Sequence, residues 1–322
     1  MKPINTKCIV CGSDSFKKVF PTKDRMFGKK GRFTLCECNT CKLAFLNPQP
    51  TAQKLKQYYV GNKYYAYQSS SKNIYSMIKK YLLKYYYSPT FFSRLLNSLL
   101  RNVPAIPKKK SYLIEGKIMD IGCGSGETLQ LLKGLGWDAY GIESNSYAVS
   151  VASKNNLKNV KLGTYELLKF YKKNFFDAIR LYHVLEHIDD PKLCLKLIHQ
   201  KLKKQGELII GVPNYDSFHR RVFRSYWYNL DSPRHLYLFS VNTLKKLLEK
   251  EHFIINKIDY HSVYGVTGSM RNILEEKFGK SNTLLKSVFF GMAMTILFYP
   301  IERFLDVLHQ GDIIIVRAST KI

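Results

Sequence analysis

The stretch MDIGCGSG, residues 119–126, decides the fold class of this chain. An apolar run ends at Asp120, and three glycines follow at alternate positions, Gly122, Gly124 and Gly126. Because glycine has no Cβ, a ligand can approach the backbone of such a loop closely, and a helix that follows it offers free N–H groups. The stretch therefore predicts a nucleotide-type binding loop. Its spacing excludes the Gly-x-Gly-x-x-Gly motif of dinucleotide-dependent dehydrogenases.

Short apolar runs alternate with amphipathic stretches from residue 116 onward. Strands are predicted at 117–121, 137–142, 160–162, 176–181, 206–212, 254–261 and 312–318. Helices are predicted at 128–135, 146–154, 191–203 and 241–251. This alternation predicts an α/β fold with one Rossmann-like sheet of seven strands. The long gap before the last strand predicts a helical insertion at 264–310.

Glu143 ends the second predicted strand, where a carboxylate can accept both hydroxyls of a ribose. Together with Asp120 and the three glycines, this pattern resembles the class I S-adenosylmethionine (SAM)-dependent methyltransferases. The resemblance implies that Gly122 and Gly124 line the methionine moiety of SAM and that Glu143 holds its ribose. Gly163 and Thr164 would lie near the adenine. The residues expected at the cofactor are Asp120, Gly122, Cys123, Gly124, Gly126, Glu143, Ser144, Gly163, Thr164 and Leu181.

The stretch HVLEH, residues 183–187, follows the fourth predicted strand and supplies candidate catalytic residues. His183, Glu186 and His187 can act as a general base, cap a helix or bind a metal. A similar sequence motif occurs in the methyltransferases that the chain resembles. In ubiquinone-type O-methyltransferases the motif is Glu-x-x-Glu-His, which binds a divalent cation. His183 replaces the first Glu, which argues against magnesium because imidazole suits softer metals. A loop that orients SAM through its backbone is the alternative.

A second candidate stretch, residues 227–240, contains Pro233, Arg234 and His235. It is similar to a Pro-Arg-His-x-x-x-Phe-Ser stretch beside the substrate entrance of the same methyltransferases. His235 is expected to be a general base for a hydroxyl acceptor, ahead of His187, and Arg234 to hold a carboxylate or phosphate. Ser240 also makes a suitable helix N-cap, so part of the stretch can serve only to start a helix.

Two Cys-x-x-Cys pairs lie near the N-terminus, Cys8 with Cys11 and Cys38 with Cys41. Four thiolates at this spacing favour tetrahedral zinc, and the site would be structural because no position is left for a catalytic water. Cys36 is expected in the small core, although it can compete as a ligand. Neither pair lies in a βαβ pattern, which argues against a redox motif.

Residues 41–48, CKLAFLNP, complete a headpiece that resembles the zinc ribbons joined to class I methyltransferases in a bacterial subfamily. Members of that subfamily often occur among genes for surface polysaccharides and envelope glycans. The expected domains are a zinc ribbon at 1–48, a helical linker or lid at 49–110, a methyltransferase domain at 111–263 and 311–322, and the helical insertion at 264–310, a lid or a membrane-surface contact.

The chain carries 51 Lys and Arg against 24 Asp and Glu, a net charge of +27. This surplus favours a polyanionic neighbour, although lysines spread along the whole chain are also an ordinary surface composition. The N-terminus has no apolar core of a secretory signal, so a cytoplasmic location is expected. Basic aromatic stretches at 74–103 and 284–308 suggest attachment to an anionic membrane surface, peripheral to the inner membrane, with packing on the sheet as the alternative.

The resemblance implies methyl transfer from SAM to a small-molecule or glycan acceptor, including a lipid-linked glycan. An RNA methyltransferase is the alternative, since a zinc ribbon and a basic surface also occur in such enzymes. The Asn/Asp-Pro-Pro-Tyr/Phe motif of base N-methyltransferases is missing after the fourth strand, which argues against a nucleic acid acceptor. A third hypothesis, a non-catalytic zinc-dependent binding protein, conflicts with the intact glycine loop.

Overall fold

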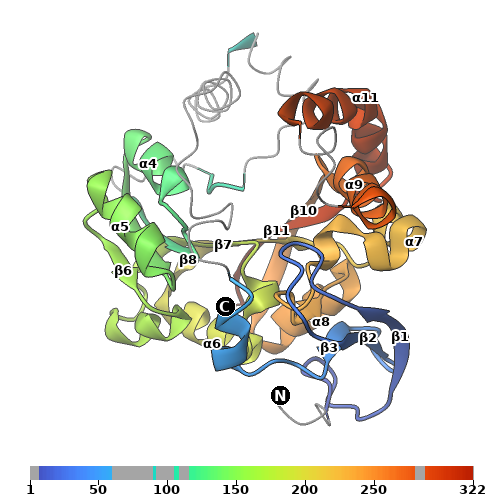
Figure 1. The fold of residues 1–322 in the computed structure, drawn as a ribbon. Coiled ribbons are helices and arrows are strands. Elements are labelled where there is room, and N and C mark those ends of the chain that lie inside the picture. The colour runs from blue at the N-terminus through green and yellow to red at the C-terminus, as the bar shows by residue number, and fades with distance from the viewer. Residues whose placement is uncertain (1–6, 60–89, 92–104, 109–115, 280–286, 322) are drawn as a thin grey trace. The chain divides into compact units, whose positions relative to one another are not determined.

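A computed structural model describes residues 7–59, 90–91, 105–108, 116–279 and 287–321 of the chain (Figure 1). The chain divides into two compact units. The first, which we call the cysteine unit, consists of Met1–Tyr58, Val212–Leu247 and Asp259–Ile315. The second, the glycine-loop unit, consists of Tyr59–Gly211, Leu248–Ile258 and Val316–Ile322. Most of the helical linker expected at 49–110 lies outside the described residues.

Seven strands form a mixed sheet in the order β10-β11-β8-β7-β4-β5-β6. The strands are β4 (Gly116–Ile121), β5 (Trp137–Glu143), β6 (Val160–Leu162), β7 (Phe176–Tyr182), β8 (Leu202–Pro213), β10 (Phe253–His261) and β11 (Ile313–Thr320). β4 pairs in parallel with β5 and β7, β5 with β6, and β7 with β8. The predicted Rossmann-like α/β fold of seven strands is confirmed.

The helices that follow the strands begin at local capping residues. Asn145 caps α5 through a side-chain oxygen that accepts the N–H of Ala148 at 3.0 Å, and Asp190 caps α6. α4 begins directly after Gly126 and packs on β5, and Figure 1 shows α4 and α5 in green. The helices are α1 (Ala52–Lys56), α4 (Glu127–Gly134), α5 (Ser146–Lys154), α6 (Pro191–Lys201), α7 (Phe218–Phe223), α8 (Val241–Lys250), α9 (Gly265–Phe278) and α11 (Val288–Val307), with short 3-10 helices η3 (Tyr165–Phe170), η4 (Leu185–His187), η5 (Arg224–Tyr226) and η6 (Tyr228–Leu230).

Most boundaries agree with the sequence prediction within two residues, and the largest difference lies at the start of β8. The prediction extends the helix before β8 to residue 203, but α6 ends at Lys201 and β8 begins at Leu202. Leu202 pairs with Phe176 of β7, and the carbonyl of Lys201 accepts the N–H of Phe175 at 2.9 Å. Pairing with a neighbouring strand therefore outweighs the helical preference of the lysines.

The glycine-loop unit has a core of apolar side chains from β4, β5 and the helices beside them. Leu129 and Leu132 of α4 pack with Ile118 of β4 and Trp137 of β5, and all four are buried. The strands of a parallel sheet are covered on both faces, which explains why the neighbouring residues Ile118 and Met119 of β4 are both fully buried. This packing fixes the end of β4, where the glycine loop starts.

The cysteine unit contains a four-stranded sheet in the order β1-β2-β3-β9. Its strands are β1 (Phe16–Thr22), β2 (Phe33–Cys38), β3 (Ala44–Asn47) and β9 (Tyr237–Leu238). β9 comes from the Pro-Arg-His stretch, and its pairs Ala44–Leu238 and Phe45–Tyr237 were not predicted. Trp227 and Tyr215 are buried in the same core as Leu35 of β2. The N-terminal strands thus share one core with residues that follow β8.

A buried cluster of charged side chains ties α11 to the rest of the cysteine unit. Nε2 of His219 in α7 lies 2.7 Å from Oε2 of Glu302 in α11. Nδ1 of His219 lies 3.7 Å from Oδ1 of Asp312. Asp306 of α11 accepts the hydroxyl of Ser262 at 2.9 Å. Burial lowers the pKa of His219, but Asp312, Glu302 and Asp306 outweigh burial and raise this pKa above its ordinary value.

Replacing His219 by asparagine is expected to lower the free energy of unfolding of the protein by about 3 kcal/mol at pH 6, because the substitution leaves buried carboxylates unpaired. A raised folded pKa means that the stabilisation by protonated His219 is complete below the unfolded pKa of about 6.5 and is lost as pH rises through the folded pKa. Urea denaturation from pH 6 to 9 measures the effect. A difference between wild type and variant that stays constant with pH would contradict it. The control is His309→Asn, because His309 is exposed in the same unit.

α11 is apolar and partly exposed. Met292, Ile296, Leu297 and Phe304 each expose more than half of their accessible surface. None of the described helices combines the length and the apolar character needed to cross a bilayer.

Candidate cofactor and metal sites

The glycine loop requires glycine at positions where the backbone is left-handed. Gly122, Gly124 and Gly126 have φ values of 70°, 56° and 81°. A Cβ added at Gly122 would lie 2.4 Å from a methyl carbon of Val184. The N–H of Gly122 donates to the carbonyl of Ile142 at 2.7 Å, which joins the loop to the end of β5. The loop is therefore compact, and its shape depends on the missing side chains.

Glu143 holds the loop in place from the end of β5. Its carboxylate is 5% exposed and accepts the N–H of Gly124 at 2.9 Å and the N–H of Asn145 at 2.8 Å. Its carbonyl accepts the N–H of Gly163, which follows β6, at 2.9 Å. The structure thus brings together the ends of β4, β5 and β6, where the predicted methionine, ribose and adenine contacts lie. Thr164 and Ser144 are exposed beside them.

Asp120 has a partner that the sequence analysis missed. Nη1 of Arg180 lies 2.8 and 2.9 Å from the two carboxylate oxygens of Asp120, and Nε of Arg180 donates to the carbonyl of Ala105 at 2.7 Å. Burial raises the pKa of Asp120, and Arg180 acts in the opposite direction. The signal in the sequence is a lone arginine inside the apolar strand FDAIRLY. Asp120 therefore fixes the β4–β7 edge as well as starting the loop.

Of two further predicted cofactor residues, Leu181 is buried and Cys123 is half-buried. Leu181 lies inside β7 and is fully buried. Burial raises the pKa of the Cys123 thiol, and the carboxylates of Asp120 and Glu143 raise it further. These effects favour the neutral thiol of Cys123 over the thiolate, which is the nucleophilic form of cysteine.

The candidate catalytic residues after β7 form local contacts in the glycine-loop unit. His183 has a left-handed backbone, with φ of 55°, and its Nδ1 lies 3.3 Å from Oε1 of Glu186, which is fully buried. Nδ1 of His187 lies 3.0 Å from the hydroxyl of Tyr59. A left-handed conformation is uncommon for a residue other than glycine and often marks a functional position.

His235 lies in the cysteine unit. It is 7% exposed, and its Nδ1 lies 2.8 Å from the carbonyl of Asn229. A carbonyl only accepts, so Nδ1 carries the hydrogen, and in the neutral ring Nε2 is the acceptor nitrogen. Nε2 lies 3.9 Å from Oδ2 of Asp231. This tautomer suits a general base.

Arg234 binds carboxylates, but they belong to the protein. Its guanidinium is fully buried, lies 2.5 Å from Asp231 and 2.9 Å from Asp24, and donates to the carbonyl of Tyr58 at 2.9 Å. These contacts connect the β1–β2 loop, the end of the N-terminal segment and the stretch before β9. They give Arg234 a structural role, in place of the carboxylate or phosphate ligand that the sequence suggests.

The four cysteines of the two pairs meet in the cysteine unit. Their Sγ atoms all lie within 4.8 Å of one another, with Cys8 and Cys41 at 3.4 Å and Cys11 and Cys38 at 3.5 Å. Cys36 is buried in β2 and does not belong to this group. All seven cysteines of the chain are described, and none forms a disulfide. The cluster has the donor set of a four-thiolate metal site.

The two Cys-x-x-Cys turns have the same local structure. The carbonyl of Cys8 accepts the N–H of Gly12 at 2.8 Å, and the carbonyl of Cys38 accepts the N–H of Lys42 at 3.0 Å. Gly12 and Lys42, which end the two turns, both have a left-handed backbone. Burial acts to raise the pKa of the Cys38 thiol. Hydrogen bonds outweigh burial and lower this pKa to about 7, and the largest contributions come from the backbone N–H groups of Cys41 and Thr40. Backbone dipoles thus favour a thiolate at this position.

Replacing Gly122 by alanine is expected to weaken SAM binding at least tenfold and to destabilise the protein by about 1–3 kcal/mol, because the Cβ needs a left-handed backbone and meets Val184. Calorimetric titration with SAM and thermal unfolding measure both effects. The matched control is Gly134→Ala in α4, where a Cβ meets nothing within 4 Å. Equal behaviour of the two variants would contradict the prediction.

The fold and the loop define a class of protein, a SAM-dependent methyltransferase domain. The family model described as a methyltransferase domain matches residues 87–255, more than half of the chain, and the chain belongs to this family.

Curated relatives match a shorter part of the chain. A ubiquinone biosynthesis O-methyltransferase from Pelagibacter ubique is 35% identical over 103 residues, which is 30% of this chain and 42% of the relative. A protein of the same name from Glaesserella parasuis is 31% identical over 129 residues, 37% of this chain and 54% of the relative. The chain thus spans about half or less of the length of these relatives. A SAM-dependent methyltransferase structure from Archaeoglobus fulgidus is 23% identical, with 74% of this chain and 99% of that chain covered and a TM-score of 0.47.

Proposed function

We propose that the chain transfers the methyl group of SAM to a small-molecule or glycan acceptor. The observation that carries this proposal is the contact between Glu143 and the N–H of Gly124, which places a carboxylate against a glycine loop at the ends of β4 and β5. SAM supplies an electrophilic methyl group. The residues proposed to hold it are Gly122 and Gly124 for the methionine moiety, Glu143 for the ribose hydroxyls and Gly163 for the adenine.

The proposed general base is His235. Its Nδ1–H is directed at the carbonyl of Asn229, which fixes the ring and leaves the acceptor lone pair on Nε2. His187 ranks second because the hydroxyl of Tyr59 can donate or accept, so this contact does not fix which ring nitrogen of His187 carries the hydrogen. His183 is held by Glu186. In this proposal, the two latter residues shape the loop after β7.

Two measurements test the methyl-transfer proposal. Calorimetry is expected to show that the protein binds one SAM per chain, and a protein that is folded but does not bind SAM would refute the proposal. The second measurement incubates the protein with SAM labelled in its methyl group and with cell extract. Label that survives ribonuclease supports a small-molecule or glycan acceptor. Label that ribonuclease releases would favour the alternative function, an RNA methyltransferase. The net charge of +27 supports this alternative because Lys and Arg bind the phosphate backbone of nucleic acids.

We also propose that Cys8, Cys11, Cys38 and Cys41 hold a structural zinc ion. The four thiols fit this ion because their mutual separations suit a tetrahedral site and no ligand position remains for water. The proposed role is to fix the two turns at the base of β1 to β3.

A peripheral contact of the cysteine unit with an anionic membrane surface is proposed from α11. Its exposed side chains Met292, Ile296, Leu297 and Phe304 are apolar, in a chain with a large positive charge. The protein is expected to float with vesicles that contain anionic lipid at moderate salt. Absence of flotation would refute the contact.

A further inference from the structure

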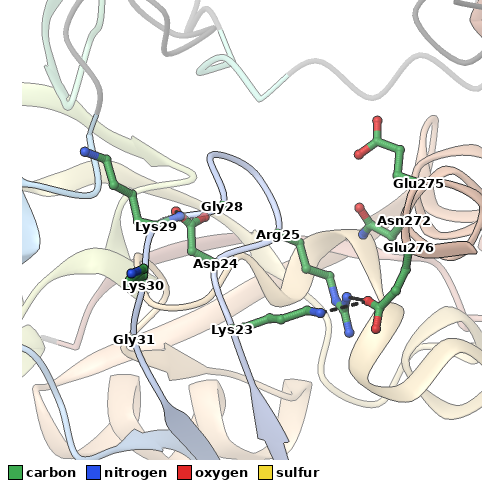
Figure 2. Close-up of a pocket in the computed structure, with 10 residues that line it drawn as sticks. All are labelled: Lys23, Asp24, Arg25, Gly28, Lys29, Lys30, Gly31, Asn272, Glu275 and Glu276. Carbon is green, nitrogen blue, oxygen red and sulfur yellow. Dashed lines mark hydrogen bonds and ion pairs between the residues drawn. The ribbon is translucent and has the colours of Figure 1, made fainter. Parts of the chain in front are cut away.

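A charged pocket of about 470 Å³ lies within the cysteine unit, between the β1–β2 loop and α9 (Figure 2). Seven residues of the loop, between Lys23 and Gly31, form one wall, and three residues of α9 form the other. A volume of this size accommodates a small molecule. Neither the glycine loop nor the cysteine cluster contributes to it.

The loop wall is held in one conformation by buried polar contacts. Asp24 is 3% exposed, and its carboxylate accepts the N–H groups of Phe27 at 3.2 Å and Lys29 at 3.1 Å as well as the guanidinium of Arg234 at 2.9 Å. The hydroxyl of Tyr58 donates to the carbonyl of Lys30 at 2.9 Å. The backbone that carries Lys29 and Lys30 is therefore fixed before any ligand binds, which lowers the entropic cost of binding.

Each acidic side chain of the pocket already has an arginine partner. Asp24 pairs with Arg234, and Glu275 accepts Nε of Arg271 at 2.7 Å. Glu276 binds Arg25, and Figure 2 shows Arg25 and Lys23 both directed at this carboxylate. Arg25 is further fixed by the carbonyl of Ser225 and by the ring of Tyr226. The acidic wall is thus neutralised by the protein itself.

The remaining charge in the pocket is positive. Lys29 and Lys30 are exposed, and among the described residues neither ammonium group has an ion pair or a hydrogen bond. Lys23 shares Glu276 with Arg25, so it also contributes excess positive charge. Lys23, Lys29 and Lys30 line the pocket from one loop and give it a surplus of positive charge, which suits an anion with more than one negative charge.

We propose that this pocket binds a phosphate or diphosphate ester. Lysine ammonium groups act as point charges and suit a tetrahedral phosphate in several orientations, whereas planar carboxylates are bound best by a free arginine fork. The arginines near the pocket are occupied by protein carboxylates, which leaves lysines as the ligand-binding groups. The proposal depends on neither SAM nor methyl transfer.

The direct test is calorimetric titration of the full chain with inorganic diphosphate at low salt. The test variant is Lys29→Gln with Lys30→Gln, and the matched control is Lys245→Gln with Lys246→Gln, an adjacent exposed lysine pair on α8. We expect wild type and control to bind alike and the test variant to bind about tenfold more weakly or worse, since two charge-assisted contacts are lost. No binding to folded wild type, or an equal loss in both variants, would overturn the proposal.

A second arm distinguishes a soluble phosphate ester from a lipid headgroup. The protein is mixed with vesicles that contain phosphatidic acid, with and without diphosphate. Flotation that diphosphate abolishes and that the Lys29→Gln, Lys30→Gln variant lacks assigns the site to a lipid phosphate. Diphosphate binding without flotation assigns it to a soluble ester. Flotation that neither diphosphate nor the Lys29→Gln, Lys30→Gln variant changes would show that the pocket is not the membrane contact. The calorimetric titration alone then decides whether the pocket binds a phosphate ester.

Discussion

Replacing Glu143 by alanine is expected to lower the affinity for SAM by about 100-fold or more. The change removes the carboxylate proposed to accept the ribose hydroxyls and leaves the N–H groups of Gly124 and Asn145 without their acceptor. Hydrogen bonds to a charged group contribute about 1.5–3 kcal/mol each, and 1.4 kcal/mol corresponds to a tenfold change in affinity. Calorimetric titration with SAM measures the loss.

The control for this variant is Glu249→Ala, which removes an exposed carboxylate from α8. Its SAM affinity is expected to equal that of the wild type. If Glu143→Ala binds SAM normally while remaining folded, the ribose contact is wrong, and with it the assignment of the loop. Far-UV circular dichroism of both variants verifies that the loss is local.

Replacing Cys41 by serine is expected to remove the metal and to unfold the small sheet around it. Wild-type protein should contain one equivalent of zinc, and the variant close to none, because one thiolate of four is lost. Zinc contributes about 10–16 kcal/mol to the folding of small zinc-finger peptides, more than a typical domain has to spare. Metal analysis and hydrogen exchange of the amides of β2 and β3 measure the two effects.

Cys36→Ala is the matched control, since Cys36 lies in the same strand as Cys38 but not in the cluster. It is expected to keep the full equivalent of zinc. Loss of zinc in this variant would show that Cys36 is a ligand. Wild-type protein that contains no zinc after purification with zinc present would contradict the structural site.

Local patterns in the sequence predicted the glycine-loop unit well. Apolar periodicity and capping residues are properties of neighbouring positions, so β6 and α5 have the bounds that their sequences predict. The end of α6 was less accurate because pairing of Leu202 with Phe176 depends on a strand that is distant in the sequence. The four-cysteine cluster was predictable because its spacing alone specifies the ligands.

Long-range partners account for what the sequence analysis missed. Arg180 contacts Asp120, and Arg234 contacts Asp24. In both pairs the two residues are far apart in the sequence, and no local pattern indicates which acidic residue an arginine will bind. Arg234 illustrates the consequence, because a conspicuous arginine in a candidate site proved to be bound by protein carboxylates. The two-residue strand β9 is too short for periodicity to reveal.

The pairing of β3 with β9 has a consequence for the order in which the chain can fold during synthesis. Phe45 and Ala44 leave the ribosome long before their partners Tyr237 and Leu238. Until those partners arrive, β3 is an unpaired edge with four buried-type residues exposed to other nascent chains. The four cysteines proposed to hold zinc all precede β3, so the proposed site can form before β9 has been synthesised. The edge of β3 therefore stays exposed until the chain has been synthesised as far as Leu238, whether or not the proposed zinc site has formed.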